Sequence, residues 1–210
     1  MQPRVDPRLA TVQSHLSATA RVLQLTIEQC GPQILAAADL VAEAFRHGGK
    51  LLLCGNGGSA ADCQHMAAEL TSRLTSDFVR PGLPALALTT DSSFLTAYAN
   101  DFHFDGIFAR QVEAFGQPGD VLLGISTSGS SKNVVKAVEL ARSRQMRTIV
   151  LTGNRGCLRD LADVALCVPS DVTQHIQETH LALEHLVCHF VERALYTATG
   201  EPLADRTAAA

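Results

Sequence analysis

Short apolar runs recur along the chain and indicate a series of buried strands. Each run is five or six residues long and continuously apolar, which is typical of strands buried on both faces of a sheet. The runs are LLLCG (51–55), ALALT (85–89), VLLGIS (121–126), TIVLTG (148–153) and ALCVPS (165–170). The sequence therefore predicts five strands.

Segments with a helical spacing of apolar residues separate these strands. Residues 59–74 and 130–146 have this spacing, and a long helix is expected from about Thr173 to Ala198. Strands that alternate with helices indicate right-handed βαβ units and a parallel sheet covered on both faces. We therefore predict a single α/β domain of three layers, with a five-stranded parallel sheet of the flavodoxin-like kind.

The segments before and after this domain, which we place at residues 48–198, have simpler patterns. Residues 1–47 are predicted to form two N-terminal helices, with a break at Gly31-Pro32. Because the later helices already fill both faces of the sheet, this helical extension is expected to make subunit contacts. The tail at 199–210 is small and polar, and is expected to be loose.

Composition narrows the class of protein. A chain of 210 residues with 46% apolar residues can bury one sizeable core. Its net charge of −4 and its lack of a Lys/Arg-rich run argue against nucleic acid or an anionic membrane as the partner. Without a signal-peptide pattern or an apolar stretch near about 18 residues, it is expected to be cytoplasmic. Its six cysteines, with no CxxC pair, are expected to be buried thiols.

The segments that follow the predicted strands carry the candidate chemistry, because ligands bind beyond the carboxyl ends of parallel strands. The segment STSGSSKN (126–133) combines hydroxyl groups with a glycine at a helix start, which favours a phosphate. An ordinary helix N-cap with spare serines is the alternative. The chain has no GKS or GKT, and GNGGSA (55–60) is not GxGxxG, so nucleotide-binding loops are disfavoured.

Histidines supply a second kind of candidate chemistry. His65 and Glu69 are one helical turn apart and share a face. An imidazole and a carboxylate placed in this way suit zinc, although a solvated His–Glu pair has the same spacing. Four more histidines lie on the last predicted helix: His175, His180, His185 and His189. We expect one or two of these to be functional and the others to be structural, with His175 a candidate helix cap.

Together these segments resemble the bacterial phosphoheptose isomerases of the sugar isomerase (SIS) domain superfamily. The resemblance runs from roughly Gly48 to Leu195. Its motifs are GNGGSAADCQHMAAEL (55–70), RPGLPALALTTDSSFLTAYANDF (80–102), RQVEAFGQPGDVLLGISTSGSSKNVVKA (110–137), LTGNRG (151–156) and VPSDVTQHIQETHLALEH (168–185). Ser130 and Cys157 depart from the family pattern, which commonly has Asn and Gly there.

The resemblance implies an activity and a set of site residues. The activity is the conversion of sedoheptulose 7-phosphate to D-glycero-D-manno-heptose 7-phosphate through an enediol, the first step toward the ADP- or GDP-heptose of surface glycans such as lipopolysaccharide. One zinc ion per subunit is implied, with His65, Glu69, Gln177 and His185 as ligands. We take Glu69 as the catalytic base and His185 as its partner acid. The implied substrate contacts are Asn56, Gly57, Gly58, Glu69, Asn100, Asp101, Ser126, Thr127, Ser128, Ser131 and Gln177.

The spacing of Gln177 and His185 raises a geometric question. Eight residues of regular helix rise by roughly 12 Å, too far for both side chains to reach one ion. Either Gln177 precedes the regular helix, or a neighbouring subunit supplies one of the two ligands and the site lies at an interface of the homotetramer that the family resemblance implies. If one chain supplies every ligand, His180 is the substitute for Gln177. Arg73, one turn beyond Glu69, either reaches the substrate or is an ordinary surface arginine.

The main alternative is a non-catalytic SIS protein that binds a sugar phosphate or associates with a replication initiator. Relatives of the latter kind lack the last histidine of the motif, so the presence of His185 favours an enzyme. No helix-turn-helix segment is visible, which argues against a transcription regulator. A further alternative is an isomerase of a sugar phosphate of another chain length.

Overall fold

The predicted strands form one parallel sheet in the computed structural model of the chain, which describes residues 6–197 and 199–203. The strands are β1 (Leu51–Gly55), β2 (Ala85–Ala87), β3 (Val121–Ser126), β4 (Arg147–Thr152) and β5 (Val164–Cys167). Their order is β2-β1-β3-β4-β5, and every neighbouring pair is parallel. This is the flavodoxin-like doubly wound order, so the predicted fold class is confirmed.

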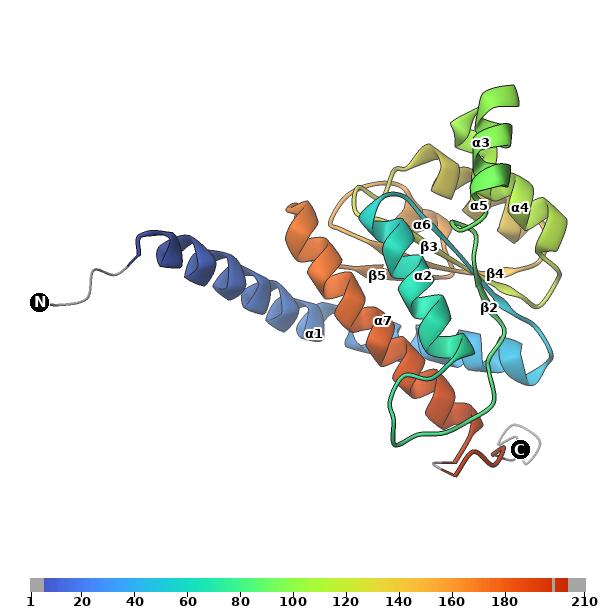
Figure 1. The fold of residues 1–210 in the computed structure, drawn as a ribbon, viewed down its shortest axis with the longest axis horizontal. Helices are drawn as coiled ribbons and strands as arrows, with labels where there is room; N and C mark the ends of the chain where they lie inside the picture. The colour runs from blue at the N-terminus through green and yellow to red at the C-terminus, as the bar shows by residue number, and fades with distance from the viewer. Residues whose placement is uncertain (1–5, 198, 204–210) are drawn as a thin grey trace, which may run out of the picture.

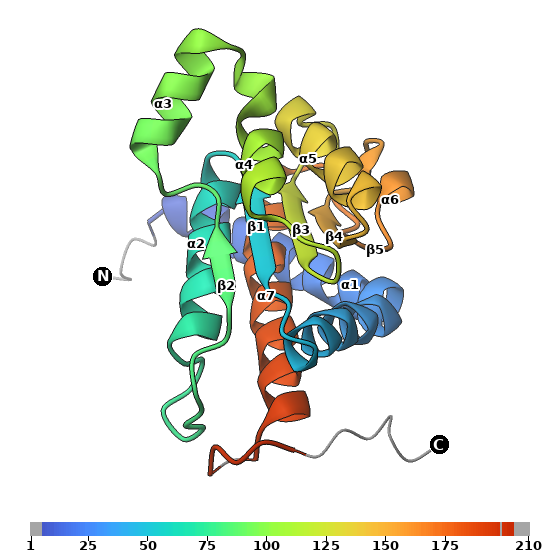
Figure 2. The same cartoon turned by 90° about the vertical axis from the view of Figure 1, so that its right-hand side faces the viewer.

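Helices cover both faces of the sheet and make three layers (Figures 1 and 2). Because successive residues of a strand point to opposite faces, Leu51 and Leu53 pack under one layer and Leu52 and Cys54 under the other. The first layer contains α1 (Arg8–Arg46), α2 (Gly58–Thr71) and α7 (Thr173–Leu195). The second contains α4 (Ile107–Phe115), α5 (Lys132–Ser143) and α6 (Leu158–Leu161). No helix among the described residues is long and apolar enough to cross a bilayer.

The N-terminal segment forms one helix of 39 residues, so the predicted break at Gly31-Pro32 is wrong. A proline inside a helix costs about 3 kcal/mol, and the apolar face that follows Pro32 offsets this cost by burial against the sheet and α7. Buried there are Ile34, Ala37, Ala38, Val41 and Ala42. The second half of α1 therefore belongs to the core. The first half projects beyond the domain (Figure 1), where Leu9, Val12 and Leu16 are exposed.

Strands β2 and β5 differ from the prediction of burial on both faces. In β2 only Ala87 is buried, with Leu86 45% exposed, and in β5 only Leu166 is buried. The reason is that both lie at the edges of the sheet, where β2 pairs with β1 alone and β5 with β4 alone. An apolar run shows that a segment forms a strand, but its burial depends on which neighbours cover it.

The chain after α7 is partly ordered by hydrogen bonds. Helix α7 ends at Leu195, before the predicted end at Ala198, which lies outside the described residues. Tyr196 and Pro202 then form an antiparallel bridge, and the Leu203 N–H donates to the Leu195 carbonyl at 2.8 Å. Residues 199–203 thus differ from the loose tail expected at 199–210, of which 204–210 lie outside the described residues.

The thiols are free, and most are buried as predicted. Cys30, Cys54, Cys63 and Cys188 are buried, and burial raises the pKa of the Cys54 thiol to about 12. Cys157 is exposed, which corrects the prediction for that residue, because it lies in the turn before α6 rather than on a strand.

Candidate active site

Three of the predicted zinc ligands converge where α2 packs against α7. His65 and Glu69 share a face of α2, with His65 Nε2 3.6 Å from Glu69 Oε1. His185 on α7 faces them, and its Nε2 lies 2.9 Å from His65 Nε2. The three ligand atoms lie within 4.8 Å of one another. The fold therefore brings together residues that are more than a hundred positions apart.

The donor set fits a divalent metal ion such as zinc. Two imidazole nitrogens in contact, with a carboxylate beside them, present lone pairs that one cation can satisfy at once. Imidazole and carboxylate bind zinc at about 2.0–2.2 Å, and a catalytic zinc keeps one position open. The side chains of His65 and Glu69 are 41% and 20% exposed, which leaves that side of the cluster accessible.

Gln177 does not join this cluster within the chain. It lies inside the regular helix α7, so the alternative in which it precedes that helix is wrong. Its amide lies against the start of α2, where a Cβ on Gly58 would overlap with it. A glycine at position 58 therefore makes room for the Gln177 side chain.

His180 is not the substitute ligand. It is completely buried, and its Nε2 lies 3.1 Å from the Thr152 carbonyl at the end of β4. Because a carbonyl only accepts, Nε2 carries the proton, and Nδ1 has no partner among the described residues. His180 is thus a core histidine, and one chain supplies three of the four predicted ligands.

Burial of His180 predicts a pH dependence of stability. Burial lowers the pKa of His180 to about 4, against the opposing effect of its hydrogen bond to Thr152. The unfolded chain takes up the proton near pH 6.5 and the folded chain only near pH 4, so stability present above pH 6.5 is lost as the pH falls toward 4. Over this pH range the free energy of unfolding falls by up to about 3 kcal/mol.

We expect His180→Gln to flatten this acid slope, measured by urea unfolding between pH 4 and 6.5. The exposed His103→Gln serves as the control and should keep the slope of the unmodified protein. An unchanged slope in His180→Gln would contradict the assignment.

The serine segment after β3 forms a cluster of hydroxyl groups at the start of α5. Ser126 Oγ lies 2.9 Å from Ser131 Oγ and 3.3 Å from Ser128 Oγ. Ser131 is the N-cap residue of α5, whose free amides and dipole favour an anion. Thr127 and Ser128 line a hollow of about 210 Å³ together with residues that follow β4 and β5. The predicted phosphate-binding residues are therefore brought together.

Gly129 shapes this segment. It has a φ of +63°, and a Cβ there would overlap with the Arg155 carbonyl. Replacing Gly129 with Ala should destabilise the fold by more than the 1–2 kcal/mol or so of left-handed strain alone, because the two loops must separate.

Gly48→Ala is the matched control, since Gly48 has a φ of +77° and a Cβ added there would meet no atom within 4 Å. Urea unfolding of both variants measures the difference, and equal losses of stability would contradict the role given to the loop contact.

Asn133 is a positioning residue that the sequence interpretation missed. Its buried amide exchanges hydrogen bonds with the Asn56 amide, at 2.9 and 2.8 Å. The pair joins the loop after β1 to the first turn of α5, at the point where the strand order reverses. Asn133 is the last residue of the STSGSSKN motif, and its place in that motif could have indicated a role at the site.

The residues at the end of α3 (Ser92–Asp101) remain apart from both clusters. Asn100 and Asp101 are exposed, and the Asn100 amide donates to Asp101 at 2.9 Å. Within the described residues, no hydrogen bond or ion pair joins either of them to the other predicted site residues. Helix α3 projects beyond the sheet (Figure 2). Their contact with substrate stays a prediction, as does that of the exposed Arg73.

Arg80 is a second residue that the sequence interpretation missed. Its guanidinium donates to the carbonyls of Glu69 and Leu70, both at 2.7 Å, and so caps the end of α2. It also pairs with Glu192 of α7 at 3.3 Å, and neither side chain is exposed. Arg80 therefore fixes the turn of α2 that carries Glu69. Arg80 is the first residue of the family motif at 80–102, but its role could not be predicted because its partners lie on two other segments.

A buried carboxyl group lies behind the metal-ligand cluster. Glu184 precedes His185 on α7, and its oxygens have no hydrogen-bond partner among the described residues. Burial, and secondarily the charge of Asp62, raises the pKa of Glu184 to about 9. Glu184 is therefore a neutral acid at neutral pH, and Glu69 is the carboxylate that faces the two imidazoles.

Comparisons with known proteins agree with this fold and site. The family model of the SIS domain matches residues 14–153, which places the chain among the SIS-domain proteins. The phosphoheptose isomerase of Roseiflexus sp. (strain RS-1) is 54% identical over 182 residues, which are 86% of this chain and 91% of that protein. The chain belongs to the phosphoheptose isomerase family, as its motifs indicated.

Solved structures support the same assignment. The phosphoheptose isomerase of Neisseria gonorrhoeae matches with a TM-score of 0.83 and 43% identity, over 88% of this chain and 98% of that one. The phosphoheptose isomerase of Francisella tularensis matches with a TM-score of 0.85 and 37% identity, over 90% of this chain and 100% of that one. The full SIS fold is thus shared with proteins of this family.

Proposed function

We propose that the protein isomerises sedoheptulose 7-phosphate to D-glycero-D-manno-heptose 7-phosphate, which supplies the heptose of a nucleotide-activated precursor for surface glycans. The observation that carries the proposal is the convergence of His65, Glu69 and His185 in a chain that is about half identical to phosphoheptose isomerases. The presence of His185 in this cluster also argues against the non-catalytic alternative.

The proposed reaction moves a proton between the first two carbons of the sugar. The Glu69 carboxylate takes a proton from C1 of the ketose and returns it to C2, and the intermediate between the two transfers is an enediol. His185 carries a proton between the oxygens on C2 and C1, so that a carbonyl is lost at one and formed at the other. Zinc bound by His65, Glu69 and His185 would supply Lewis-acid stabilisation of the negative charge on these oxygens. Because a ligand atom cannot also take a proton, Glu69 would act as base through its other carboxylate oxygen, and His185 would carry the proton on its other ring nitrogen.

The serine cluster is proposed to hold the 7-phosphate. Ser126, Ser128 and Ser131 place three hydroxyl groups at the start of α5, which favours an anion. Binding at the far end of the substrate orients the reacting carbons, which lowers the barrier without any covalent role for the serines.

We also propose that the active form is a homotetramer with sites between subunits, in which the partner's α7 supplies Gln177 as the fourth ligand. Two observations support this. Gln177 and His185 lie two turns apart on the regular helix α7. In addition, Glu69 and His185 border a hollow of about 690 Å³ with the exposed apolar side chains Leu186 and Phe190, a face suited to cover by another subunit.

Mixing two inactive variants tests the shared site. Glu69→Gln and Gln177→Ala homotetramers, unfolded and refolded together, should recover part of the activity. In the hybrids, some sites take Glu69 from a Gln177→Ala chain and Gln177 from a Glu69→Gln chain, and these sites are intact. No recovery, in a mixture shown by native mass spectrometry to contain hybrids, would contradict a site shared between chains.

The substrate assignment is tested by incubating the protein with sedoheptulose 7-phosphate and following the product by NMR. The proposal predicts the anomeric C1 signals of the cyclic heptose product and much slower turnover of shorter ketose phosphates. Specific binding of the sugar phosphate without any product, with zinc present, would favour the non-catalytic alternative.

A further inference from the structure

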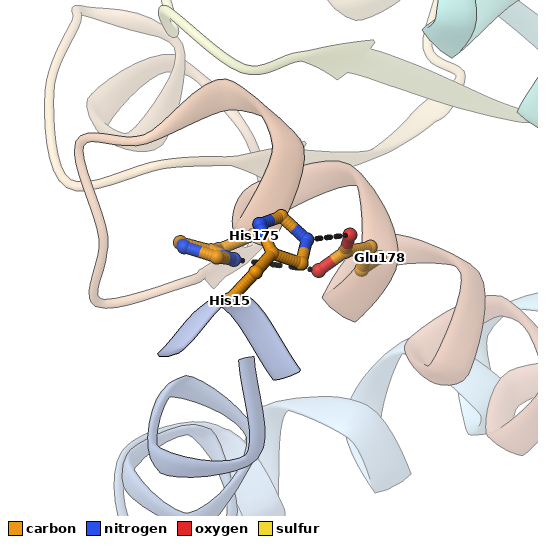
Figure 3. Close-up of side chains that lie close together, drawn as sticks. All are labelled: His15, His175 and Glu178. Atoms are coloured by element: carbon orange, nitrogen blue, oxygen red, sulfur yellow. Dashed lines mark hydrogen bonds and ion pairs between the residues drawn. The ribbon is translucent and has the colours of Figure 1, made fainter. Parts of the chain in front are cut away.

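A second cluster of metal-ligating side chains joins α1 to α7. His15 projects from the first half of α1 toward His175 and Glu178 on the first turns of α7 (Figure 3). The ligand atoms of the three residues lie within 4.8 Å of one another. Glu178 is seven residues before His185, which is roughly 10 Å along the helix. The cluster is therefore separate from the candidate active site.

The contacts within this cluster centre on the Glu178 carboxylate. His15 Nε2 lies 2.8 Å from Glu178 Oε1, and His175 Nδ1 lies 3.4 Å from Glu178 Oε2. Thr19 and His15 both hydrogen-bond to the Glu178 carboxylate, one at each oxygen. His175 is buried, whereas His15 and Glu178 are about 40% exposed. The cluster thus offers two imidazole nitrogens and one carboxylate at the edge of solvent.

These separations are close to those of a zinc site. Tetrahedral zinc with bonds of about 2.0–2.1 Å places neighbouring ligand atoms about 3.3 Å apart. The distance from His15 Nε2 to Glu178 Oε1 is 2.8 Å, and that from His175 Nδ1 to Glu178 Oε2 is 3.4 Å. These two values lie on either side of the expected separation. Two ligands three residues apart on one helix and a third on the facing helix form a recurring arrangement for metal sites between helices.

We propose that His15, His175 and Glu178 form a second divalent-metal site of the zinc type, which ties the first half of α1 to α7. The fourth position is open to water. A hollow of about 470 Å³ borders His15 and His175, and its other lining residues are small: Ala10, Thr11, Ser14 and Ala18. The role of this site is structural, because it holds the part of α1 that projects beyond the domain.

Thr19 supplies the outer hydrogen bond that such sites require. Its hydroxyl donates to Glu178 Oε2 and lies 2.8 Å from His175 Nδ1. With a metal ion on His175, the hydroxyl keeps its bond to Glu178 and fixes the orientation of that carboxylate. Outer hydrogen bonds of this kind typically change metal affinity by 10- to 100-fold. Thr19→Val should therefore weaken binding without abolishing it.

Cobalt binding to full-length variants tests the proposal. The background variant His65→Ala/His185→Ala removes the active-site cluster and leaves the second one. It should bind one Co²⁺ per chain with visible absorption bands of nitrogen- and oxygen-ligated cobalt, measured by equilibrium dialysis and spectroscopy. Adding His15→Ala or His175→Ala to this background should abolish both the binding and the bands.

His47→Ala in the same background is the matched control. His47 and Glu43 on α1 also form a His–carboxylate pair, with 3.3 Å between Nδ1 and Oε1, but no third ligand among the described residues joins them. This control should keep the full cobalt stoichiometry. Failure of the background variant to bind cobalt, or binding that survives both His15→Ala and His175→Ala, would overturn the proposal. Because no substrate is involved, either result is independent of the proposed isomerase activity.

Discussion

Replacing Glu69 with Gln should lower kcat for sedoheptulose 7-phosphate by about 10³-fold or more, while KM and the free energy of unfolding change little. The amide has nearly the size of the carboxylate but cannot accept a proton from carbon. The side chain is partly exposed beside His65, so the substitution leaves no cavity. Steady-state kinetics, urea unfolding and the zinc content per chain should be measured together.

A second measurement separates proton transfer from metal binding. In D₂O, the unmodified enzyme should exchange a C1 proton of the ketose with solvent, and Glu69→Gln should not, even when its zinc content is complete. Glu113→Gln, on the exposed face of α4, is the control and should behave as the unmodified protein. Activity of Glu69→Gln within tenfold of the unmodified protein would remove Glu69 from the role of base.

Replacing Glu192 with Gln should lower the free energy of unfolding by about 3–5 kcal/mol, the largest loss of stability that we expect from a single substitution. The Arg80 and Glu192 side chains are fully buried and in contact. Removing one partner leaves the other charge buried and only partly compensated by the carbonyls that Arg80 contacts. Urea unfolding at neutral pH measures the change.

The exposed pair Arg110–Glu113 provides the comparison for this substitution. Its atoms are closer, at 2.8 Å, but both side chains are about half exposed. Arg110→Ala should therefore cost less than about 1 kcal/mol. Because Arg80 caps the turn that carries Glu69, Glu192→Gln should also reduce kcat. A loss of stability as small as that of Arg110→Ala would contradict the role of the buried pair.

The sheet could be predicted from the sequence because three of its five strands, β1, β3 and β4, are central and covered on both faces. LLLCG and VLLGIS are buried on both faces and appear as continuous apolar runs. The edge position of β2 and the continuity of α1 through Pro32 could not be predicted, since both depend on what packs beside them. Short-range pattern thus identifies the elements, and tertiary contacts decide their exposure.

The candidate site was predicted to a similar extent. The spacing of His65 and Glu69 placed them on one face, and the family resemblance added His185, which the fold brings to 2.9 Å from His65. Arg80 and Asn133 escaped prediction because their partners are distant in the sequence. The same is true of the cluster at His15, whose ligands meet only because α1 packs along α7.

Metal removal and return tests the central claim, that His65, Glu69 and His185 form a metal-dependent proton-transfer site. Protein treated with a chelator and freed of it should fail to convert sedoheptulose 7-phosphate, and added Zn²⁺ should restore turnover. His185→Ala should gain no activity from the same addition, whereas His175→Ala should recover as the unmodified protein does. Full turnover by metal-free protein, or rescue of His185→Ala by zinc, would contradict the account.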